Sequence, residues 1–329
     1  MKRFLLLGIA LSLFACAKHE ATATNEKKFT VAVIPQGTTH EYWKSIHAGA
    51  VKASRDYAAQ HVKVNIIWKG PLREDDREQQ VQVVEGFFMQ HVSGIVLAPF
   101  DKNALVRPVE EATRAGMPVV VIDSALESKD PISFVASDNH HGGELAAEEM
   151  SRILNGKGKV LLLRYQEGVF STEQREKGFT DAIAKHPGIR LISSNQYAGA
   201  TRDTAKSAME NLLNRYGNEI DGVFTPNESS TAGALLALED ADKAGKLKFI
   251  GFDSSDIFVH AMRDHKLDGI VVQNPFHMGD LGVKTLVDHL LGKPIEKRVD
   301  TGVTLITPAN LNTPESQTLL HPPLDQYLK

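Results

Sequence analysis

Apolar and polar positions follow a repeating order of strand and helix patterns along the chain. A run rich in β-branched residues from Phe29 to Ile34 has the composition and length of a buried strand. After a turn-prone segment, Tyr42, Ile46 and Ala50 fall on one face of a helix. The sequence therefore predicts a strand, a short loop and a helix at its start.

The same pairing recurs through the rest of the chain. Further strand patterns cover 62–68, 94–98, 118–122, 132–136, 159–163, 190–196, 222–224, 249–252, 269–272 and 303–306. Helix patterns cover 74–90, 105–115, 142–154, 173–185, 201–215, 230–244, 257–264 and 278–291. This alternation predicts an α/β protein with parallel sheets covered by helices on both faces. Since about eleven strands exceed one domain, we expect two sheets, followed by an irregular tail.

The first residues have the features of a targeting segment. Lys2 and Arg3 precede an apolar stretch from Phe4 to Phe14 that is too short to span a bilayer. The following Ala15 and Cys16 complete a segment that resembles a bacterial lipobox, so we expect residues 1–16 to be a lipoprotein signal peptide with Cys16 lipidated. An ordinary secretory peptide with a chance cysteine is the alternative.

Residues 17–28 are small and polar, which is typical of a flexible tether. Cys16 is the single cysteine of the chain, so the folded part contains no disulfide. We therefore expect a membrane-anchored lipoprotein in the periplasm or at the cell surface, whose fold starts near Phe29.

Composition narrows the classes of partner. The chain has 329 residues, of which 42% are hydrophobic and 24% charged, as in ordinary globular proteins. Its formal net charge of −4 argues against a nucleic-acid partner.

Residues suited to ligand binding stand where the predicted strands end. They are Gln36, Phe100, Asp123, Asn227, Asp253 and Gln273. Ligands of open α/β sheets bind at this edge. Carboxylates and amides bind hydroxyl groups, and aromatic rings cover the C–H face of a sugar, so the set indicates a polyol. Polar residues also cap helices, and we expect one or two of these to be structural caps.

The first loop agrees with this interpretation. It carries Gln36, His40, Tyr42 and Trp43 but lacks the glycine spacing of a phosphate-binding loop. Its chemistry suits a neutral, hydroxyl-bearing molecule.

Several stretches together resemble a known family. They are 135–143, 171–179, 223–238, 250–256 and 271–279. In this order they are similar to the type I periplasmic binding proteins of ABC sugar transporters, the ribose-binding group, whose fold is shared by lactose-repressor-type sugar-binding domains. The resemblance implies two Rossmann-like lobes joined by three hinge strands. It places 29–137 and 274–302 in an N-terminal lobe and 138–273 and 303–329 in a C-terminal lobe.

The resemblance also assigns ligand positions. They are Gln36, His40, Tyr42, Trp43, Asp123, Asn227, Asp253 and Gln273. Ser124 and Glu173 stand where ribose-type proteins carry arginines, and Arg175 lies close by. Because these forked donors are absent, we expect a ligand that is not held as ribose is.

The implied function is that of a monomeric solute-binding protein of an ABC importer. It would capture a monosaccharide or related polyol by domain closure and deliver it to a membrane permease, with no cofactor and no chemical step. A receptor for signalling or for autoinducer-2 is an alternative within the same fold.

Two other classes are considered. A zinc-binding receptor would use His140, His141, Glu144 and Glu148, which have helical spacing. An enzyme would use carboxylates such as Asp123, Glu173 and Asp253 as a glycosidase pair, but no nucleophile elbow accompanies them.

Overall fold

The computed structural model describes residues 27–328. The expected signal peptide, the lipidation site Cys16 and nearly all of the expected tether lie outside the described residues. No helix among residues 27–328 is long and apolar enough to cross a membrane.

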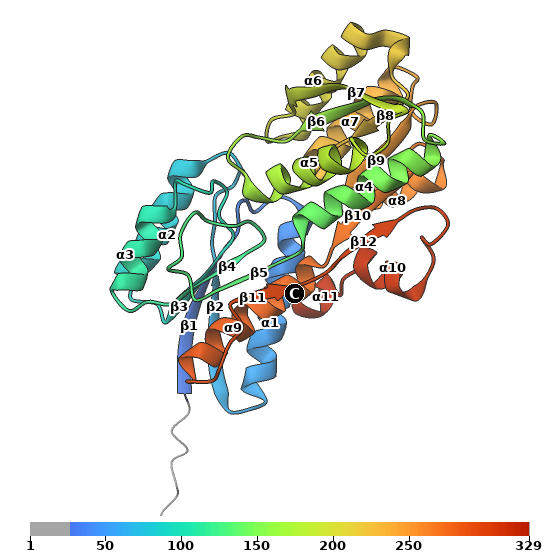
Figure 1. The fold of residues 1–329 in the computed structure, drawn as a ribbon. Helices are drawn as coiled ribbons and strands as arrows, with labels where there is room; N and C mark the ends of the chain where they lie inside the picture. Colours follow the sequence, from blue (N-terminus) through green and yellow to red (C-terminus); the bar gives the residue numbers. More distant parts are fainter. Residues whose placement is uncertain (1–26, 329) are drawn as a thin grey trace, which may run out of the picture.

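Two six-stranded sheets form the centres of two lobes (Figure 1). The first sheet has the order β11-β5-β4-β3-β1-β2. Its strands are β1 (Lys27–Ile34), β2 (Val62–Trp68), β3 (Gly94–Leu97), β4 (Val119–Ile122), β5 (Ser133–Ala136) and β11 (Arg298–Asp300). Every neighbouring pair in it is parallel.

The second sheet repeats this arrangement with one difference. Its order is β12-β10-β9-β8-β6-β7. Its strands are β6 (Gly158–Arg164), β7 (Ile189–Tyr197), β8 (Gly222–Phe224), β9 (Lys248–Phe252), β10 (Gly269–Gln273) and β12 (Val303–Ile306). The edge strand β12 runs antiparallel to β10, whereas the other pairs are parallel as predicted.

Helices cover both faces of each sheet. Those of the first lobe are α1 (Glu41–Ala58), α2 (Arg77–Met89), α3 (Val106–Arg114) and α9 (Pro275–Leu290). Those of the second lobe are α4 (Asn139–Ile153), α5 (Phe170–Ile183), α6 (Arg202–Tyr216), α7 (Glu228–Asp240) and α8 (Asp256–Arg263), with a 3-10 turn at Gly217–Glu219. One apolar layer lies on each side of each sheet, so the central strands β3, β4, β8 and β10 are buried along their whole length.

The chain crosses between the lobes three times. The crossings join β5 to α4, β10 to α9 and β11 to β12. The first and third are hydrogen-bonded to each other, since the Ser137 hydroxyl donates to the Gly302 carbonyl oxygen at 2.8 Å. Arg298 also donates to the carbonyl oxygens of Ala136 and Ser137, at 2.6 and 3.1 Å.

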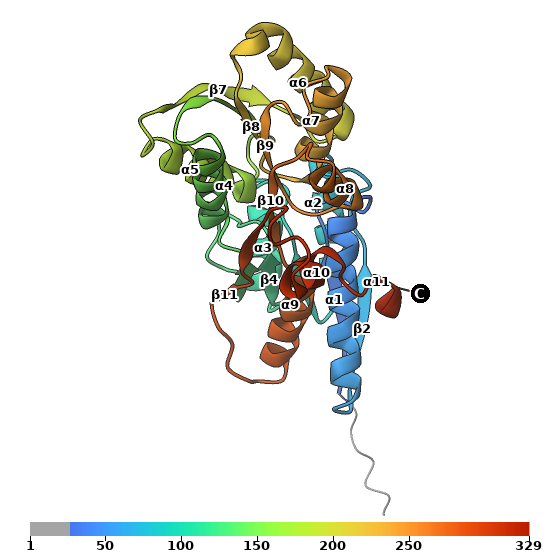
Figure 2. The same cartoon turned by 90° about the vertical axis from the view of Figure 1, so that its right-hand side faces the viewer.

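The tail is not irregular, contrary to the prediction. It forms α10 (Pro314–Leu320) and α11 (Leu324–Tyr327). The start of α10 is capped by the Thr313 hydroxyl, and Leu320 is buried in the core of the second lobe. The last helix departs from the expected division of the chain, because α11 contacts α1 of the first lobe (Figure 2).

Candidate functional site

The carboxyl ends of strands from both sheets meet around one cavity of about 370 Å³ of empty space. Eight of the predicted residues line it: Gln36, His40, Tyr42, Trp43, Asp123, Asn227, Asp253 and Gln273. The other lining residues are Glu74, Tyr165, Val169, Ser171, Thr172, Arg175 and Glu228. Both lobes therefore contribute to the same cavity.

Asp123 is the centre of the first lobe's contribution. It follows β4 directly and is buried. Its two carboxylate oxygens accept hydrogen bonds from the Gln36 amide nitrogen at 3.1 Å and from the Tyr42 hydroxyl at 2.6 Å. Burial raises the pKa of Asp123 to about 6, although the charge of Arg175 and the Tyr42 hydrogen bond act against that rise.

Asp253 has the corresponding position in the second lobe. It follows β9 directly and is buried. Its carboxylate accepts from the Gln273 amide nitrogen at 2.8 Å and from the Glu228 backbone N–H at 3.1 Å. Burial raises the pKa of Asp253, and the charge of Arg175 offsets part of this effect.

Arg175 lies on α5 and is held rigidly at the cavity. Its Nε donates to Asn139 Oδ1 at 2.8 Å, and its NH1 donates to the Pro226 carbonyl oxygen at 3.0 Å. The guanidinium carbon lies 4.1 Å from the ring centroid of Phe252. These contacts fix one guanidinium in the site, although Arg175 is two residues from the position that the resemblance indicated.

Glu74 receives hydrogen bonds from three cavity residues. Trp43 Nε1 donates to it at 2.5 Å, and His40 Nδ1 lies 3.0 Å from the same carboxylate oxygen. The hydroxyl of Tyr165, from the second lobe, donates to the other oxygen at 2.7 Å. Glu74 therefore orients the side chains of the first loop and also joins the two lobes.

Glu74 and His40 each stabilise the charged form of the other. Burial acts to raise the pKa of Glu74, but the hydrogen bond and charge of His40 hold that pKa below its ordinary value. Burial likewise acts to lower the pKa of His40, and Glu74 outweighs it, so the His40 pKa is raised. The ion pair is therefore favoured inside the cleft.

Glu228 is the first residue of α7. One of its carboxylate oxygens forms an ion pair with Arg202, and the other lies 3.8 Å from His40 Nδ1. Burial raises the pKa of Glu228, while Arg202 and His40 act to lower it. Glu228 thus brings a fourth carboxyl group to the cavity, after Glu74, Asp123 and Asp253.

The side chain of Asn227 mainly stabilises the start of helix α7. It is the N-cap of α7, and its side-chain oxygen accepts from the Ser230 backbone N–H at 3.3 Å and from the Ser230 hydroxyl at 2.5 Å. It is one of the caps expected among the strand-end residues, even though it also lines the cavity.

Three predicted site residues do not line the cavity. Phe100 is buried against Tyr165 and Val169 at the contact between the lobes. The Ser124 hydroxyl accepts from the Ser171 backbone N–H at 3.1 Å. Glu173 pairs with Lys102 at 2.5 Å and accepts from the Gly168 backbone N–H at 3.0 Å. All three instead join the lobes or order the loop between them.

Six lining residues that bear charge or a hydroxyl escaped the site prediction: Glu74, Tyr165, Ser171, Thr172, Arg175 and Glu228. Glu74 was expected to start a helix, but α2 begins at Arg77 and leaves Glu74 in the loop after β2. Tyr165 directly follows β6, so the strand-end rule already contained the signal for it. Glu228 adjoins the predicted Asn227, and Arg175 was noted only as a neighbour of Glu173.

The residues of the possible zinc site are only partly brought together, since both histidines lie near Glu144 whereas Glu148 does not join them. His140 lies 3.2 Å from Asp181, and His141 lies 3.4 Å from Glu144. Glu148 instead pairs with His186 at 3.2 Å. Among residues 27–328 no group of three or more His, Cys, Asp or Glu side chains is placed to hold a metal ion.

Known proteins share this sequence and fold. Residues 31–294 match the family model described as a periplasmic binding protein domain. The chain is 28% identical to the ribose import binding protein RbsB of Bacillus subtilis over 316 residues, covering 93% of this chain and 99% of that protein.

Two solved structures agree. A carbohydrate transporter solute-binding protein from Agrobacterium radiobacter, in complex with D-arabinose, has a TM-score of 0.84 and 33% identity, covering 89% of this chain and 99% of its own. An ABC transporter solute-binding protein from Agrobacterium vitis, with bound D-fucose, has a TM-score of 0.83 and 34% identity. The match covers 89% of this chain and 100% of that chain. As predicted, the chain belongs to the periplasmic binding protein family, in the type I group that contains the ribose-binding proteins of ABC importers.

Proposed function

We propose that this protein is the extracytoplasmic binding component of an ABC importer and that it captures a monosaccharide or a related polyol. The observation that carries the proposal is the cavity itself, whose acids, amides and aromatic rings come from both lobes. One relative is named a ribose import binding protein, and the solved structures of two similar solute-binding proteins contain D-arabinose and D-fucose. The ligand leaves unchanged, so the protein is not an enzyme and needs no cofactor.

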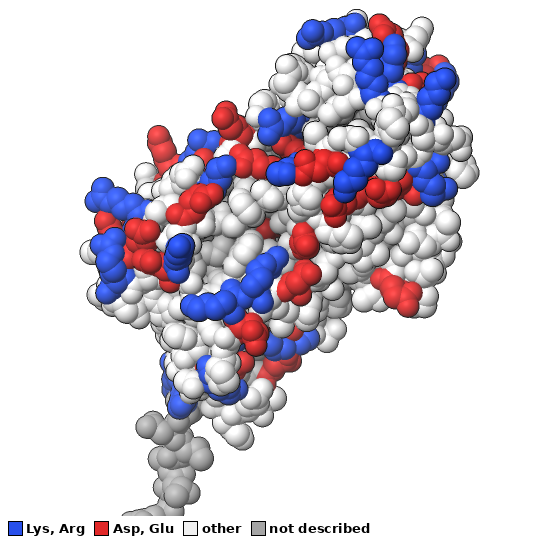
Figure 3. Space-filling model, in the orientation of Figure 1, with Lys and Arg blue, Asp and Glu red and all other residues white. Residues whose placement is uncertain are grey.

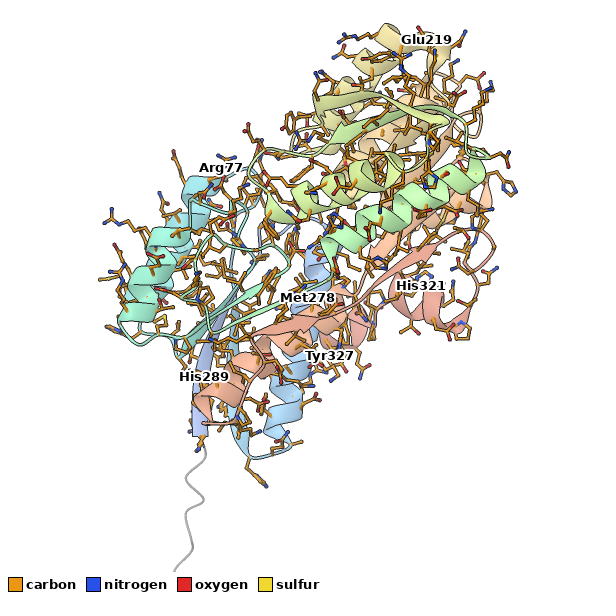
Figure 4. The ribbon with its side chains drawn as sticks, in the orientation of Figure 1. Arg77, Glu219, Met278, His289, His321 and Tyr327 are labelled. Atoms are coloured by element: carbon orange, nitrogen blue, oxygen red, sulfur yellow. The ribbon has the colours of Figure 1, made fainter. Side chains whose placement is uncertain are left out.

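Capture proceeds by closure of the lobes over the ligand. The cavity-lining carboxylate of Asp123 belongs to one lobe and that of Asp253 to the other, so a sugar held by both requires the lobes to be together. Direct bonds between the lobes complete the closed form. Besides Tyr165 to Glu74, the Lys102 backbone N–H donates to the Gly168 carbonyl oxygen at 3.0 Å. Arg77, labelled in Figure 4 at the start of α2, donates to the Glu167 carbonyl oxygen of the second lobe at 3.2 Å.

The ligand contacts follow from the cavity. We assign Gln36, His40, Tyr42, Trp43, Asp123, Asp253 and Gln273 to ligand binding, with Arg175 in place of Glu173. The three crossings between the sheets would act as hinges, separating 29–137 and 274–302 from 138–273 and the segment that starts at 303. A membrane permease then accepts the closed form. A lipid on Cys16 holds the protein at the membrane, close to the permease.

Charged side chains of both signs cover one face of the molecule. Acidic and basic side chains are interspersed over the face in Figure 3, with no broad patch of one sign. This face therefore offers no broad basic surface to a polyanion.

A thermal-shift screen of the purified folded part tests the proposal. Pentoses, hexoses, alditols and autoinducer-2 are added one at a time, and isothermal titration follows for each compound that raises the melting temperature. At least one monosaccharide or polyol is expected to bind with a one-to-one stoichiometry. Binding of autoinducer-2 alone would favour the signalling receptor, and no binding by any compound would refute sugar capture.

A further inference from the structure

The cavity carries more negative charge than positive charge. The carboxyl groups of Glu74, Asp123, Glu228 and Asp253 line it, and each of these residues is at most 8% exposed. Among the lining residues, Arg175 has the one permanent positive charge, and His40 is the one other basic side chain. Arg202, which lies outside the lining, pairs with Glu228 Oε1, so a ligand entering the cavity meets a smaller excess of acidic groups, among them Glu228 Oε2.

The basic groups are already engaged with protein partners. Arg175 donates to Asn139 and to the Pro226 carbonyl oxygen, and its NH1 stays 3.9 Å from Asp253 Oδ2, beyond hydrogen-bonding distance. His40 is hydrogen-bonded to Glu74 at 3.0 Å. Neither group neutralises Asp253 or Asp123 by direct contact.

Two acceptors at the cavity have no hydrogen-bond partner. They are Glu228 Oε2 and Gln273 Oε1, and both are buried. No buried donor atom of the described cavity-lining side chains lacks a partner in the same way. A buried acceptor without a donor is unfavourable, so both positions suit a donor group of a ligand.

A hydroxyl and an ammonium group would satisfy these acceptors differently. A sugar hydroxyl donates one hydrogen bond and leaves the local charge unchanged, whereas an ammonium group donates up to three and brings a positive charge. Burial, and to a lesser extent neighbouring carboxyl groups, raise the pKa of Asp123, Asp253 and Glu228, while the charges of Arg175, Arg202 and His40 offset part of this rise. A cation among them would relieve the repulsion between these carboxyl groups.

We propose that the natural ligand is an amino sugar or an amino polyol whose ammonium group lies against the Glu228 carboxylate. This inference rests on the proposed function, since it specifies the class of sugar for the same cavity. Its hydroxyl groups then bind Asp123, Asp253 and Gln273 as in the neutral case.

Matched pairs of compounds test the charge directly. Isothermal titration at pH 7 compares D-glucosamine, D-galactosamine, D-mannosamine and glucamine with D-glucose, D-galactose, D-mannose and sorbitol. At least one amine is expected to bind about tenfold or more tightly than its parent, and its N-acetyl form is expected to lose that advantage. If parents bind and no amine binds more tightly, the amine inference is overturned while sugar capture stands. If no member of any pair binds, the amine inference is also overturned, and the wider screen of neutral sugars decides sugar capture.

Variants at Glu228 test where the ammonium group lies. Glu228→Gln keeps the size of the side chain and removes its charge, so the preference for the amine should fall toward equality. Glu228→Asp keeps the charge and should retain most of the preference. Circular dichroism and the melting temperature establish that each variant is folded. If folded Glu228→Gln prefers the amine over its parent as strongly as the wild type does, the ammonium group does not lie against Glu228. If a variant does not fold, the comparison of amines with parent compounds in the wild type still decides the class of ligand.

Discussion

Asp123 and Asp253 occupy equivalent positions in the two lobes. Each directly follows a buried strand, and each has a left-handed backbone, with φ of 64° and 66°. The backbone N–H of Asp123 donates to Val135 at 3.1 Å, and that of Asp253 donates to Val271 at 2.8 Å, in both cases on the next strand. A glutamine amide then binds each carboxylate. The same backbone conformation after a strand thus places one carboxylate from each sheet at the cavity.

Removing either charge should weaken ligand binding more than it weakens the fold. Asparagine tolerates a left-handed backbone, whereas alanine there costs about 1–2 kcal/mol, so Asp253→Asn is the better test than Asp253→Ala. We expect the affinity for the sugar found in the screen to fall about 10- to 100-fold, because a charge-assisted hydrogen bond is lost. The melting temperature of the ligand-free protein should change by only a few degrees.

A surface aspartate supplies the control. Asp242 has a φ of 54° and an exposed side chain, so Asp242→Asn makes the same change away from the cavity. It should leave affinity unchanged. Equal affinities for Asp253→Asn and the wild type would show that Asp253 acts only in shaping the loop.

The hydrogen bond between Tyr165 and Glu74 should stabilise the closed form. Tyr165→Phe removes only the hydroxyl that reaches across the lobes at 2.7 Å and keeps the ring that packs on Phe100. We expect ligand release to become several-fold faster in stopped-flow measurements, with the association rate nearly unchanged. The matched variant Tyr197→Phe, at a tyrosine that is 39% exposed, should behave as the wild type. A slower association with an unchanged release rate would contradict a role in closure.

Asp123 should make the stability of the ligand-free protein depend on pH. Its pKa rises from the ordinary value of 3.8 to about 6 on folding, so the folded state holds more protons between these pH values. This contribution to the free energy of unfolding is therefore present below about pH 4 and is lost as the pH rises through 6. The free energy of unfolding of Asp123→Asn, taken relative to that of the wild type, should therefore rise by about 1–3 kcal/mol from pH 4 to pH 7. Urea unfolding at each pH measures this difference. A constant difference across this range would mean that Asp123 does not titrate there.

Much of the fold was predictable because its strands are buried on both faces. Strands such as β3 and β4 are fully buried, and their unbroken apolar runs, bounded by turn residues, located them to within a residue. The failures lie at the edges. β11 (Arg298–Asp300) is short and partly exposed, so it carries no apolar pattern, and the short helices α10 and α11 are specified by caps and by contacts with other elements.

Which residues line the cavity was predictable where one residue follows a buried strand, as Asp123 and Asp253 do. Glu74 was missed because its position depends on a loop whose side chains are fixed by His40, Trp43 and Tyr165, which are distant in sequence. Phe100, Ser124 and Glu173 were predicted to bind the ligand but do not line the cavity. A residue type and a place after a strand do not reveal whether a side chain turns into the cavity or toward the other lobe.

Anchoring by Cys16 remains a prediction from sequence. Cys16→Ser in the full chain should prevent lipidation, and the protein should move from the membrane fraction to the soluble extracytoplasmic fraction. Detergent partitioning and intact-protein mass measure this change. A variant that stays in the membrane fraction would indicate another means of attachment. Sugar affinity should be unchanged, because the site lies wholly within residues 36–273.

The end of the chain should help to hold the lobes together. Leu320 of α10 is buried in the second lobe, whereas Tyr327 of α11 lies on the first, with its ring 5.0 Å from the Arg55 guanidinium carbon and 5.5 Å from the Phe276 ring (Figure 4). Arg55 also donates to the Gln326 carbonyl oxygen at 2.8 Å.

Tyr327→Ala removes the aromatic part of this contact and leaves both cores intact. We expect small-angle scattering of the ligand-free variant to show a larger radius of gyration, because the closed form loses a contact that the open form lacks. Ligand affinity should fall a few-fold for the same reason. His321→Ala, at an exposed residue between α10 and α11, is the control and should match the wild type in both measurements. If Tyr327→Ala scatters and binds as the wild type does, α11 contributes to the first lobe alone and has no part in closure.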